Sequence, residues 1–186
     1  MIRPYKPQDE ESVLHIWLEA STIGHAFIPR SYWESKIDNM REIYLPQSET
    51  YIYTDTTTGK ISGFISLVGD YLAAIFVAPS CQRRGIGQAL MAHAKKLKNE
   101  LVLNVYTENT QAILFYKQQG FKIVDEQTDE ATGHKEWYST NNKNESILKS
   151  QYKLSGYSRF FLNFIAKGRF VPAFYKLITN RIQHLS

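Results

Sequence analysis

Residues 71–90 read YLAAIFVAPSCQRRGIGQAL and combine an apolar strand, a short loop and the start of a helix. The predicted strand, Tyr71 to Ala78, is apolar on both faces, as expected where a sheet is covered on each side. Pro79 ends it, because proline cannot donate to a strand ladder. The helix that follows begins with backbone N–H groups that lack an internal partner, and its dipole favours an anion there.

The loop before this helix has the composition of a phosphate-binding turn. Gly85 and Gly87 carry no Cβ, so a ligand can approach the main chain closely. Arg83 and Arg84 add positive charge beside it. Neither a P-loop nor a complete dinucleotide-binding fingerprint is present. The stretch therefore indicates an anion site, with a solvated basic turn as the alternative.

A second informative stretch, NTQAILFYKQQGF at residues 109–121, follows a predicted strand at 101–106. Together the two stretches give V-x-P-x-x-Q-R-R-G-I-G and N-x-x-A-I-x-F-Y-x-x-x-G-F, one strand and one helix apart. This pair resembles the GCN5-related N-acetyltransferases (GNAT), over about residues 1–140. The sequence is most similar to the small bacterial members of the YiaC/YjaB type.

The remaining elements follow from hydrophobic period and turn residues. We expect further strands at 1–5, 51–54, 60–68, 121–126 and 135–139, and a helix beginning at Pro7. After a loop at 21–29, Ser31 and Glu34 form a capping-box pattern that predicts one helix to about Leu45. Residues 109–119 form a helix ended by Gly120. This pattern predicts an α/β protein, and the resemblance implies the GNAT fold, a mixed, mostly antiparallel sheet with helices on both faces.

Charge divides the chain into two segments of different character. Residues 1–140 carry 14 Lys and Arg against 17 Asp and Glu, whereas residues 141–186 carry 8 against one. We therefore predict a GNAT domain at 1–140 and a basic, aromatic extension at 141–186, whose apolar residues have helical spacing. The extension has three interpretations. It packs on the domain or on a second copy as a homodimer contact, lies on an acidic membrane surface, or binds nucleic acid; specific nucleic-acid binding is the weakest of these.

Composition also indicates in which cellular compartment the protein is expected. The single cysteine, Cys81, excludes an internal disulfide and fits a reducing compartment. No apolar run reaches the roughly 18 residues that span a bilayer, and the N-terminal residues lack the apolar core of a signal peptide. We expect a cytoplasmic protein. No cluster has metal-ligand spacing.

The resemblance implies that acetyl-CoA, the acetyl donor, lies in a gap between the strands at 71–78 and 101–106. The main chain of Ile75, Phe76 and Val77 would pair with the pantetheine arm. Asn109, which caps its helix in any case, would also touch the cofactor. The backbone N–H groups expected to hold the pyrophosphate are those of Arg83, Arg84, Gly85, Ile86, Gly87 and Gln88.

For catalysis, Tyr116 matches the family tyrosine near the cofactor sulfur, where it would donate a hydrogen bond to the departing thiolate. Many relatives have a glutamate base five residues before the motif asparagine, and here that position is Asn104, which cannot take a proton. Deprotonating a lysine amine at pH 7 costs about 4.6 kcal/mol, whereas an α-amine costs only about 1.1 kcal/mol. His25 is the leading substitute base, against a structural role in its loop.

Weaker candidates for the base are Glu108, Glu19 and His134. The sequence thus predicts acetyl transfer to a primary amine by direct attack in a ternary complex. The acceptor is a protein lysine, an N-terminal amine or a small-molecule amine, framed by the loop at 24–28 and the Tyr32-Trp33 pair. The alternative is a catalytically weak CoA-binding domain whose tail tethers it to a membrane or a protein partner.

Overall fold

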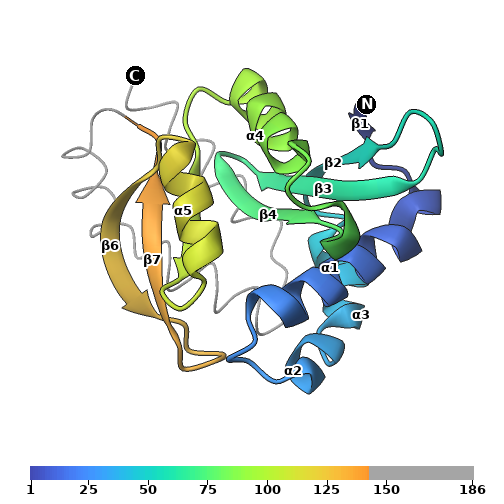
Figure 1. The fold of residues 1–186 in the computed structure, drawn as a ribbon. Helices are drawn as coiled ribbons and strands as arrows, with labels where there is room; N and C mark the ends of the chain where they lie inside the picture. Colours follow the sequence, from blue (N-terminus) through green and yellow to red (C-terminus); the bar gives the residue numbers. More distant parts are fainter. Residues whose placement is uncertain (143–186) are drawn as a thin grey trace.

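The computed structural model describes residues 1–142, which form one seven-stranded sheet in the order β1-β2-β3-β4-β5-β7-β6 (Figure 1). The strands are β1 (Ile2–Pro4), β2 (Glu49–Thr54), β3 (Ile61–Val68), β4 (Tyr71–Val77), β5 (Val102–Tyr106), β6 (Lys122–Thr128) and β7 (Lys135–Thr140). Within the described residues, β4 and β5 are parallel neighbours and the other neighbours are antiparallel. The predicted mixed, mostly antiparallel sheet is therefore confirmed.

Helices cover both faces of this sheet, as predicted (Figure 1). One face carries α4 (Ile86–Leu97) and α5 (Thr110–Gln118). The other carries α1 (Glu10–Gly24), α2 (Arg30–Glu34), α3 (Ile37–Asn39) and the π-helical η2 (Met40–Tyr44). Two short 3-10 turns, η1 (Pro7–Asp9) and η3 (Pro79–Cys81), lead into α1 and into the loop before α4.

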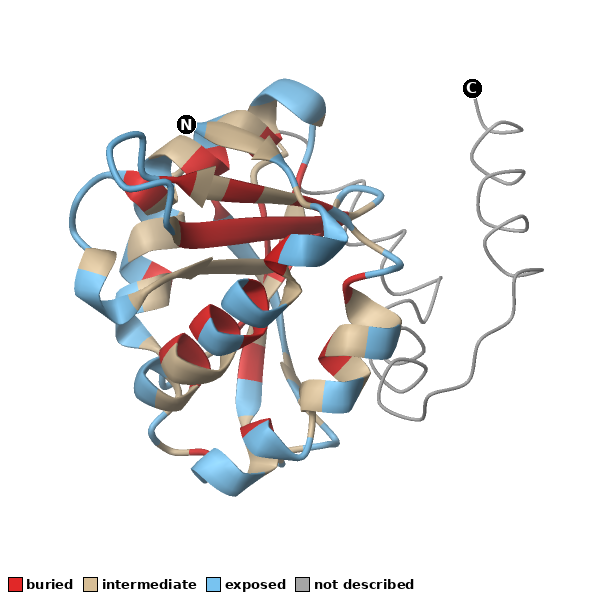
Figure 2. Ribbon diagram, turned by 90° about the vertical axis from the view of Figure 1, so that its right-hand side faces the viewer, coloured by how far each residue is buried: buried red, intermediate tan, exposed pale blue. Residues whose placement is uncertain are grey.

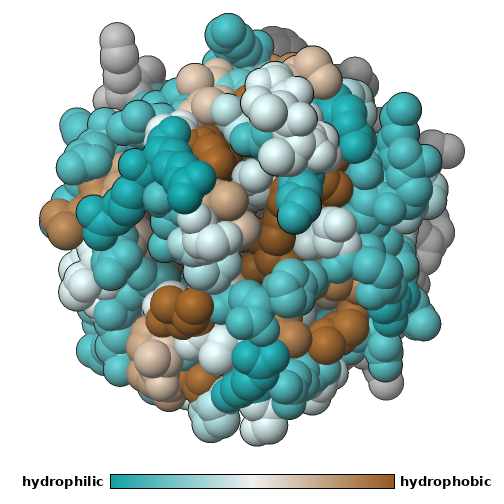
Figure 3. Space-filling model, turned by 45° about the vertical axis from the view of Figure 1, so that its right-hand side comes forward, coloured by the Kyte–Doolittle hydropathy of each residue, from teal (hydrophilic) through white to brown (hydrophobic). Residues whose placement is uncertain are grey.

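Each face has its own apolar core. Leu90 and Met91 of α4 pack with Leu103 of β5 on one side. Val13 and Trp17 of α1 pack with β2 and β3 residues on the other. Figure 2 shows β3 as the most continuously buried strand, and its residues 62–67 are all buried. The surface in Figure 3 is mostly hydrophilic, with apolar side chains exposed in small groups between polar ones.

The predicted single helix from Ser31 to Leu45 is wrong. Pro29, not Ser31, occupies the N-cap position of α2, and no side chain caps that helix. The Ser35 hydroxyl donates to the Tyr32 carbonyl at 2.7 Å, and the helix ends after one turn and a half. The loop predicted from Ser21 also begins later, because α1 continues to Gly24.

Among the described residues, the last strand, β7, ends at Thr140. The predicted C-terminal extension lies outside the described residues apart from its first two. Within residues 1–142, no helix is long and apolar enough to cross a membrane.

The close packing of β3, β4 and α4 leaves no room for a side chain at Gly63. A Cβ there would lie 2.8 Å from the Phe76 carbonyl oxygen and 3.3 Å from Cγ2 of Ile86. Since a backbone atom cannot move aside cheaply, Gly63→Ala should lower the free energy of unfolding by about 1–3 kcal/mol in urea titrations. Gly24→Ala is the control, because its new Cβ meets Asn109 at an ordinary 3.5 Å. Equal unfolding midpoints for the two variants would contradict this packing.

Candidate functional site

The parallel strands β4 and β5 separate almost as soon as they meet. Their ladder has a single register pair, Tyr71 with Val102, next to a hydrogen bond from the Val102 N–H to the Asp70 carbonyl at 3.0 Å. Beyond this point β4 pairs only with β3. The β5-facing edge of β4 therefore keeps free main-chain groups, and an extended ligand can add to such an edge as a strand would.

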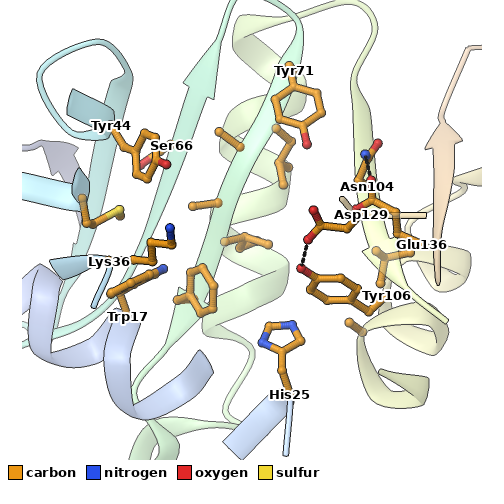
Figure 4. A pocket seen from close by; sticks show the side chains of 18 of the residues that line it. Trp17, His25, Lys36, Tyr44, Ser66, Tyr71, Asn104, Tyr106, Asp129 and Glu136 are labelled. Carbon is orange, nitrogen blue, oxygen red and sulfur yellow. Dashed lines mark hydrogen bonds between the residues drawn. The ribbon is translucent and has the colours of Figure 1, made fainter. Parts of the chain in front are cut away.

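A pocket of about 360 Å³ occupies the space between the two strands. It is lined by Tyr71–Phe76 of β4 and by Asn104–Tyr106 of β5. Trp17, His25 and Trp33 border it from the α1 and α2 side. Tyr116 borders it from α5, on the opposite face of the sheet, and Asn109 borders it from the start of that helix. The pocket thus joins the two faces through the gap (Figure 4).

The predicted phosphate loop has the expected geometry at the start of α4. Gly85 is the N-cap residue in the left-handed conformation, with φ of 81°, and no side chain caps the first N–H groups of α4. Arg83 also has a positive φ, 61°, which is uncommon for a residue other than glycine. The Arg83 and Arg84 side chains are exposed, while Ile86 is buried in the core. The helix end is thus open to an anion.

Gly87 leaves room between this helix end and the gap. A Cβ on Gly87 would lie 3.5 Å from the Phe115 ring of α5 and 3.8 Å from Cγ2 of Val77. These are ordinary contacts, so the fold itself does not require glycine at this position. The predicted cofactor residues Ile75, Phe76 and Asn109 line the pocket. Val77 and the 83–88 segment lie outside it, where β4 leads through the loop into α4.

Tyr116 is partly exposed toward the pocket, and its ring packs against Phe115 and Phe121. Among the described residues, none hydrogen-bonds the Tyr116 hydroxyl. Burial raises its pKa well above the usual value, so the phenol stays protonated and remains a donor. Asn109 accepts a hydrogen bond from the Ala112 N–H at 3.0 Å, which confirms its predicted capping role.

His25 lies at the end of α1 and reaches the pocket from the acceptor side predicted by the sequence (Figure 4). Its ring packs against Trp33 and Tyr106, at centroid distances of 5.1 and 5.3 Å. Nδ1 lies 3.1 Å from the Ser21 carbonyl oxygen. Burial lowers the pKa of His25 to about 4, so the imidazole is neutral at pH 7 but a weak proton acceptor. This environment favours the structural role over the predicted role as base.

The weaker candidates for the base do not line the pocket. Glu19 pairs with Arg30 at 2.9 Å, on the exposed side of α1. Glu108 and His134 pair with each other at 2.6 Å, and His134 packs on Phe27.

Two carboxylates that sequence reasoning missed do line the pocket. Asp129 accepts a hydrogen bond from the Tyr106 hydroxyl, and a second from Thr132 at 2.9 Å. Glu136 of β7 is 5% exposed and accepts from Asn104 Nδ2 at 2.7 Å. No local signal singles out Glu136, because its strand, KEWYST, also contains lysine, serine and threonine.

Comparisons with known proteins agree with this geometry. Residues 46–123 match the family described as "Acetyltransferase (GNAT) domain". Over 126 residues, 67% of this chain and 85% of the relative, the sequence is 43% identical to the peptidyl-lysine N-acetyltransferase YiaC of Escherichia coli K12. It is 31% identical to the peptidyl-lysine N-acetyltransferase YjaB of Salmonella typhimurium, covering 66% of this chain and 83% of the relative.

Solved structures give the same result. The solution structure of apo-form YjaB from Escherichia coli superposes with a TM-score of 0.67 at 26% sequence identity, covering 76% of this chain and 96% of that one. The fold, the open β4–β5 gap and the sequence relatives point to one family. The chain belongs to the GCN5-related N-acetyltransferases and is an acyltransferase.

Proposed function

We propose that this protein transfers the acetyl group of acetyl-CoA to the side-chain amine of a lysine in a peptide or protein. The observation that carries this proposal is the pocket that joins both sheet faces through the β4–β5 gap. A thioester and an amine that approach from opposite faces can meet only there. The similar YiaC and YjaB proteins are peptidyl-lysine N-acetyltransferases, which supports lysine as the acceptor.

Acetyl-CoA fits the residues on the α4 and α5 face. The N–H groups of residues 83–88 would hold the pyrophosphate, with Arg83 and Arg84 adding charge. The free edge of β4 at Ile75, Phe76 and Val77 would accept main-chain hydrogen bonds with the pantetheine amides. Asn109 would contact the cofactor from the start of α5. Ile75, Phe76 and Asn109 line the pocket, and the 83–88 segment follows β4 at the start of α4.

The chemistry is direct attack of the amine on the thioester carbonyl carbon in a ternary complex. The aromatic wall of His25, Trp33 and Tyr106 would orient the acceptor and exclude water. Tyr116 would donate a hydrogen bond to the sulfur as the C–S bond breaks, on the face of the sheet opposite to the acceptor. The donor is worth more in this low-dielectric site than in water.

The proposal is tested by acetyl-CoA turnover with the full-length protein, followed by release of the CoA thiol. The acceptor panel should contain lysine peptides with blocked N-termini, peptides with free N-termini and no lysine, and small amines. Turnover with the lysine peptides is expected. If only the small amines react, lysine acetylation is wrong; if acetyl-CoA binds and no acceptor reacts, acetyl transfer to these amine classes is wrong.

Gly87→Ala separates cofactor binding from folding. The new methyl group would occupy space between Val77 and Phe115 in which the protein itself makes only ordinary contacts. We expect the Kd for acetyl-CoA to rise tenfold or more in calorimetric titrations. The free energy of unfolding should stay unchanged or rise by up to about 1 kcal/mol, since alanine favours a helix. Gln118→Ala at the exposed end of α5 is the control, and equal acetyl-CoA affinity for both variants would contradict the assignment.

Tyr116→Phe tests the thiolate donor. The ring keeps its packing on Phe115 and Phe121, so acetyl-CoA affinity should stay within about twofold. We expect kcat to fall by about tenfold or more, because only the hydroxyl is lost. The control is Tyr53→Phe, which removes a hydroxyl from β2 outside the pocket. A kcat equal to that of the wild type would rule out Tyr116 as the donor.

The low pKa of His25 predicts a pH dependence of stability. The folded state holds this imidazole neutral down to about pH 4, whereas the unfolded chain binds its proton near 6.5. The unfolded state therefore binds more protons between these values, and stability falls as the pH drops from about 6.5 toward 4. His25→Gln should flatten this part of the curve in urea titrations at pH 7 and 4.5. Parallel curves for the variant and the wild type would contradict the buried, neutral state.

A further inference from the structure

Glu136 is a nearly fully buried carboxylate in the wall of the pocket, at 5% exposure. The β5–β7 register places it directly opposite Tyr106, and places Asn104 opposite Tyr138. Residues opposite each other in an antiparallel pair point to the same face, and diagonal neighbours lie within reach. Asn104, Tyr106 and Glu136 therefore share one face of the sheet (Figure 4).

This face is the one covered by α1 and α2. Tyr106 contacts His25 and Phe27, which belong to the end of α1 and the loop after it. Tyr116 reaches the pocket from α5 on the other face. Glu136 and the proposed thiolate donor thus lie on opposite faces of the sheet, which suits proton removal from the acceptor on one face and hydrogen bonding to the sulfur on the other.

The hydrogen bonds that Glu136 accepts engage only one of its two carboxylate oxygens. Asn104 Nδ2 and Gln127 Nε2 both donate to Oε1, at 2.7 and 2.6 Å. Within the described part of the chain, Oε2 receives no hydrogen bond, although a carboxylate oxygen can accept two. The Oδ1 atom of Asn104 is also buried and without a partner among these residues. Oε2 can therefore accept a hydrogen bond from an ammonium group, which carries three donors.

Resting on the proposed function, we propose that Glu136 is the general base that takes the proton from the acceptor ammonium, and that Asn104 orients the Glu136 carboxylate. The amide at position 104 stands where many relatives carry a glutamate. Glu136 supplies the carboxylate from the neighbouring strand, and Asn104 holds it by a hydrogen bond. In this arrangement the carboxylate stands on β7 and its partner amide on β5.

The surroundings of Glu136 favour this role. Burial raises the pKa of its carboxyl, and the negative charge of Asp129 raises it further, against the hydrogen bonds from Gln127 and Asn104. The other ionisable group directly opposite is Tyr106, whose hydroxyl is engaged by Asp129. A carboxylate with a raised pKa is a stronger base than an exposed one. The lowered pKa of His25 has the opposite effect on that residue.

Atoms and protons are conserved in the proposed acetyl transfer. The ammonium passes one proton to Glu136, and the nitrogen lone pair then attacks the thioester carbonyl carbon to form the C–N bond. As the C–S bond breaks, the departing sulfur takes the second proton from the nitrogen, while the Tyr116 hydroxyl donates a hydrogen bond to this sulfur. Glu136 returns its proton to solvent. The products are the acetylated amine, the free CoA thiol and one proton.

The test compares Glu136→Gln with an exchanged pair, Asn104→Glu combined with Glu136→Gln, in the full-length protein. The exchanged pair keeps one carboxylate and one amide in contact across the strands. Glu126→Gln on exposed β6 is the matched control. Two acceptors are used: a blocked peptide with one lysine, and the same peptide with S-(2-aminoethyl)cysteine, whose sulfur lowers the pKa of the amine. Acetyl-CoA affinity and unfolding temperature are measured for every variant.

We expect Glu136→Gln to lower kcat on the lysine peptide by about 100-fold or more, with acetyl-CoA affinity unchanged. The loss should be smaller on the aminoethylcysteine peptide, and the exchanged pair should recover at least tenfold. A Glu136→Gln variant within threefold of the wild type would overturn the assignment. So would an equal loss on both acceptors without recovery in the exchanged pair, since that pattern marks a structural residue.

Two further outcomes are informative. If Glu136→Gln alone does not fold, the exchanged pair decides: an active protein supports the base, and a folded, inactive one overturns it. Wild-type turnover of the lysine peptide tests the proposed function separately. Its absence would remove the proposed function and this inference together, whereas an active wild type with an equally active Glu136→Gln removes only the inference.

Discussion

The site depends on a ladder that stops after one pair. Tyr71 and Val102 join β4 to β5, and beyond them the two strands share no register. Parallel neighbours in a continuous sheet would satisfy each other's main chain and leave no room for a ligand. Here the antiparallel pairing of β4 with β3, and of β5 with β7, holds each half of the sheet in place. The gap persists because both of its edges are anchored from behind.

The two faces of the sheet differ in electrostatic character at this gap. On one face, α4 begins with uncapped N–H groups beside Arg83 and Arg84, an arrangement suited to a phosphate anion. On the other, Asp129 and Glu136 lie among aromatic rings, an arrangement suited to a cation. The helices that build the two cores therefore also separate a positively charged region from a negatively charged one.

Much of this was predictable because the signals are local. The central strand, the Gly85 turn and the Asn109 cap each follow from a few adjacent residues, and the structure has all three. The single helix predicted from Ser31 is interrupted instead, because Lys36 leaves helical geometry, with φ of −103° and ψ of 1°, between α2 and α3. The Glu136–Asn104 contact joins residues 32 positions apart, and it depends on the β5–β7 register. No sequence period specifies that register.

The position of a catalytic group in space can be kept while its position in sequence changes. Asn104 and Glu136 are diagonal neighbours on one face of an antiparallel pair, so a carboxylate on either strand lies beside the same part of the pocket. The Asn104 amide then needs a hydrogen-bond partner, because a buried polar group without one is costly. Asn104 does so by donating to Glu136. An amide where a base is expected therefore indicates that the facing strand should be searched for the carboxylate it binds.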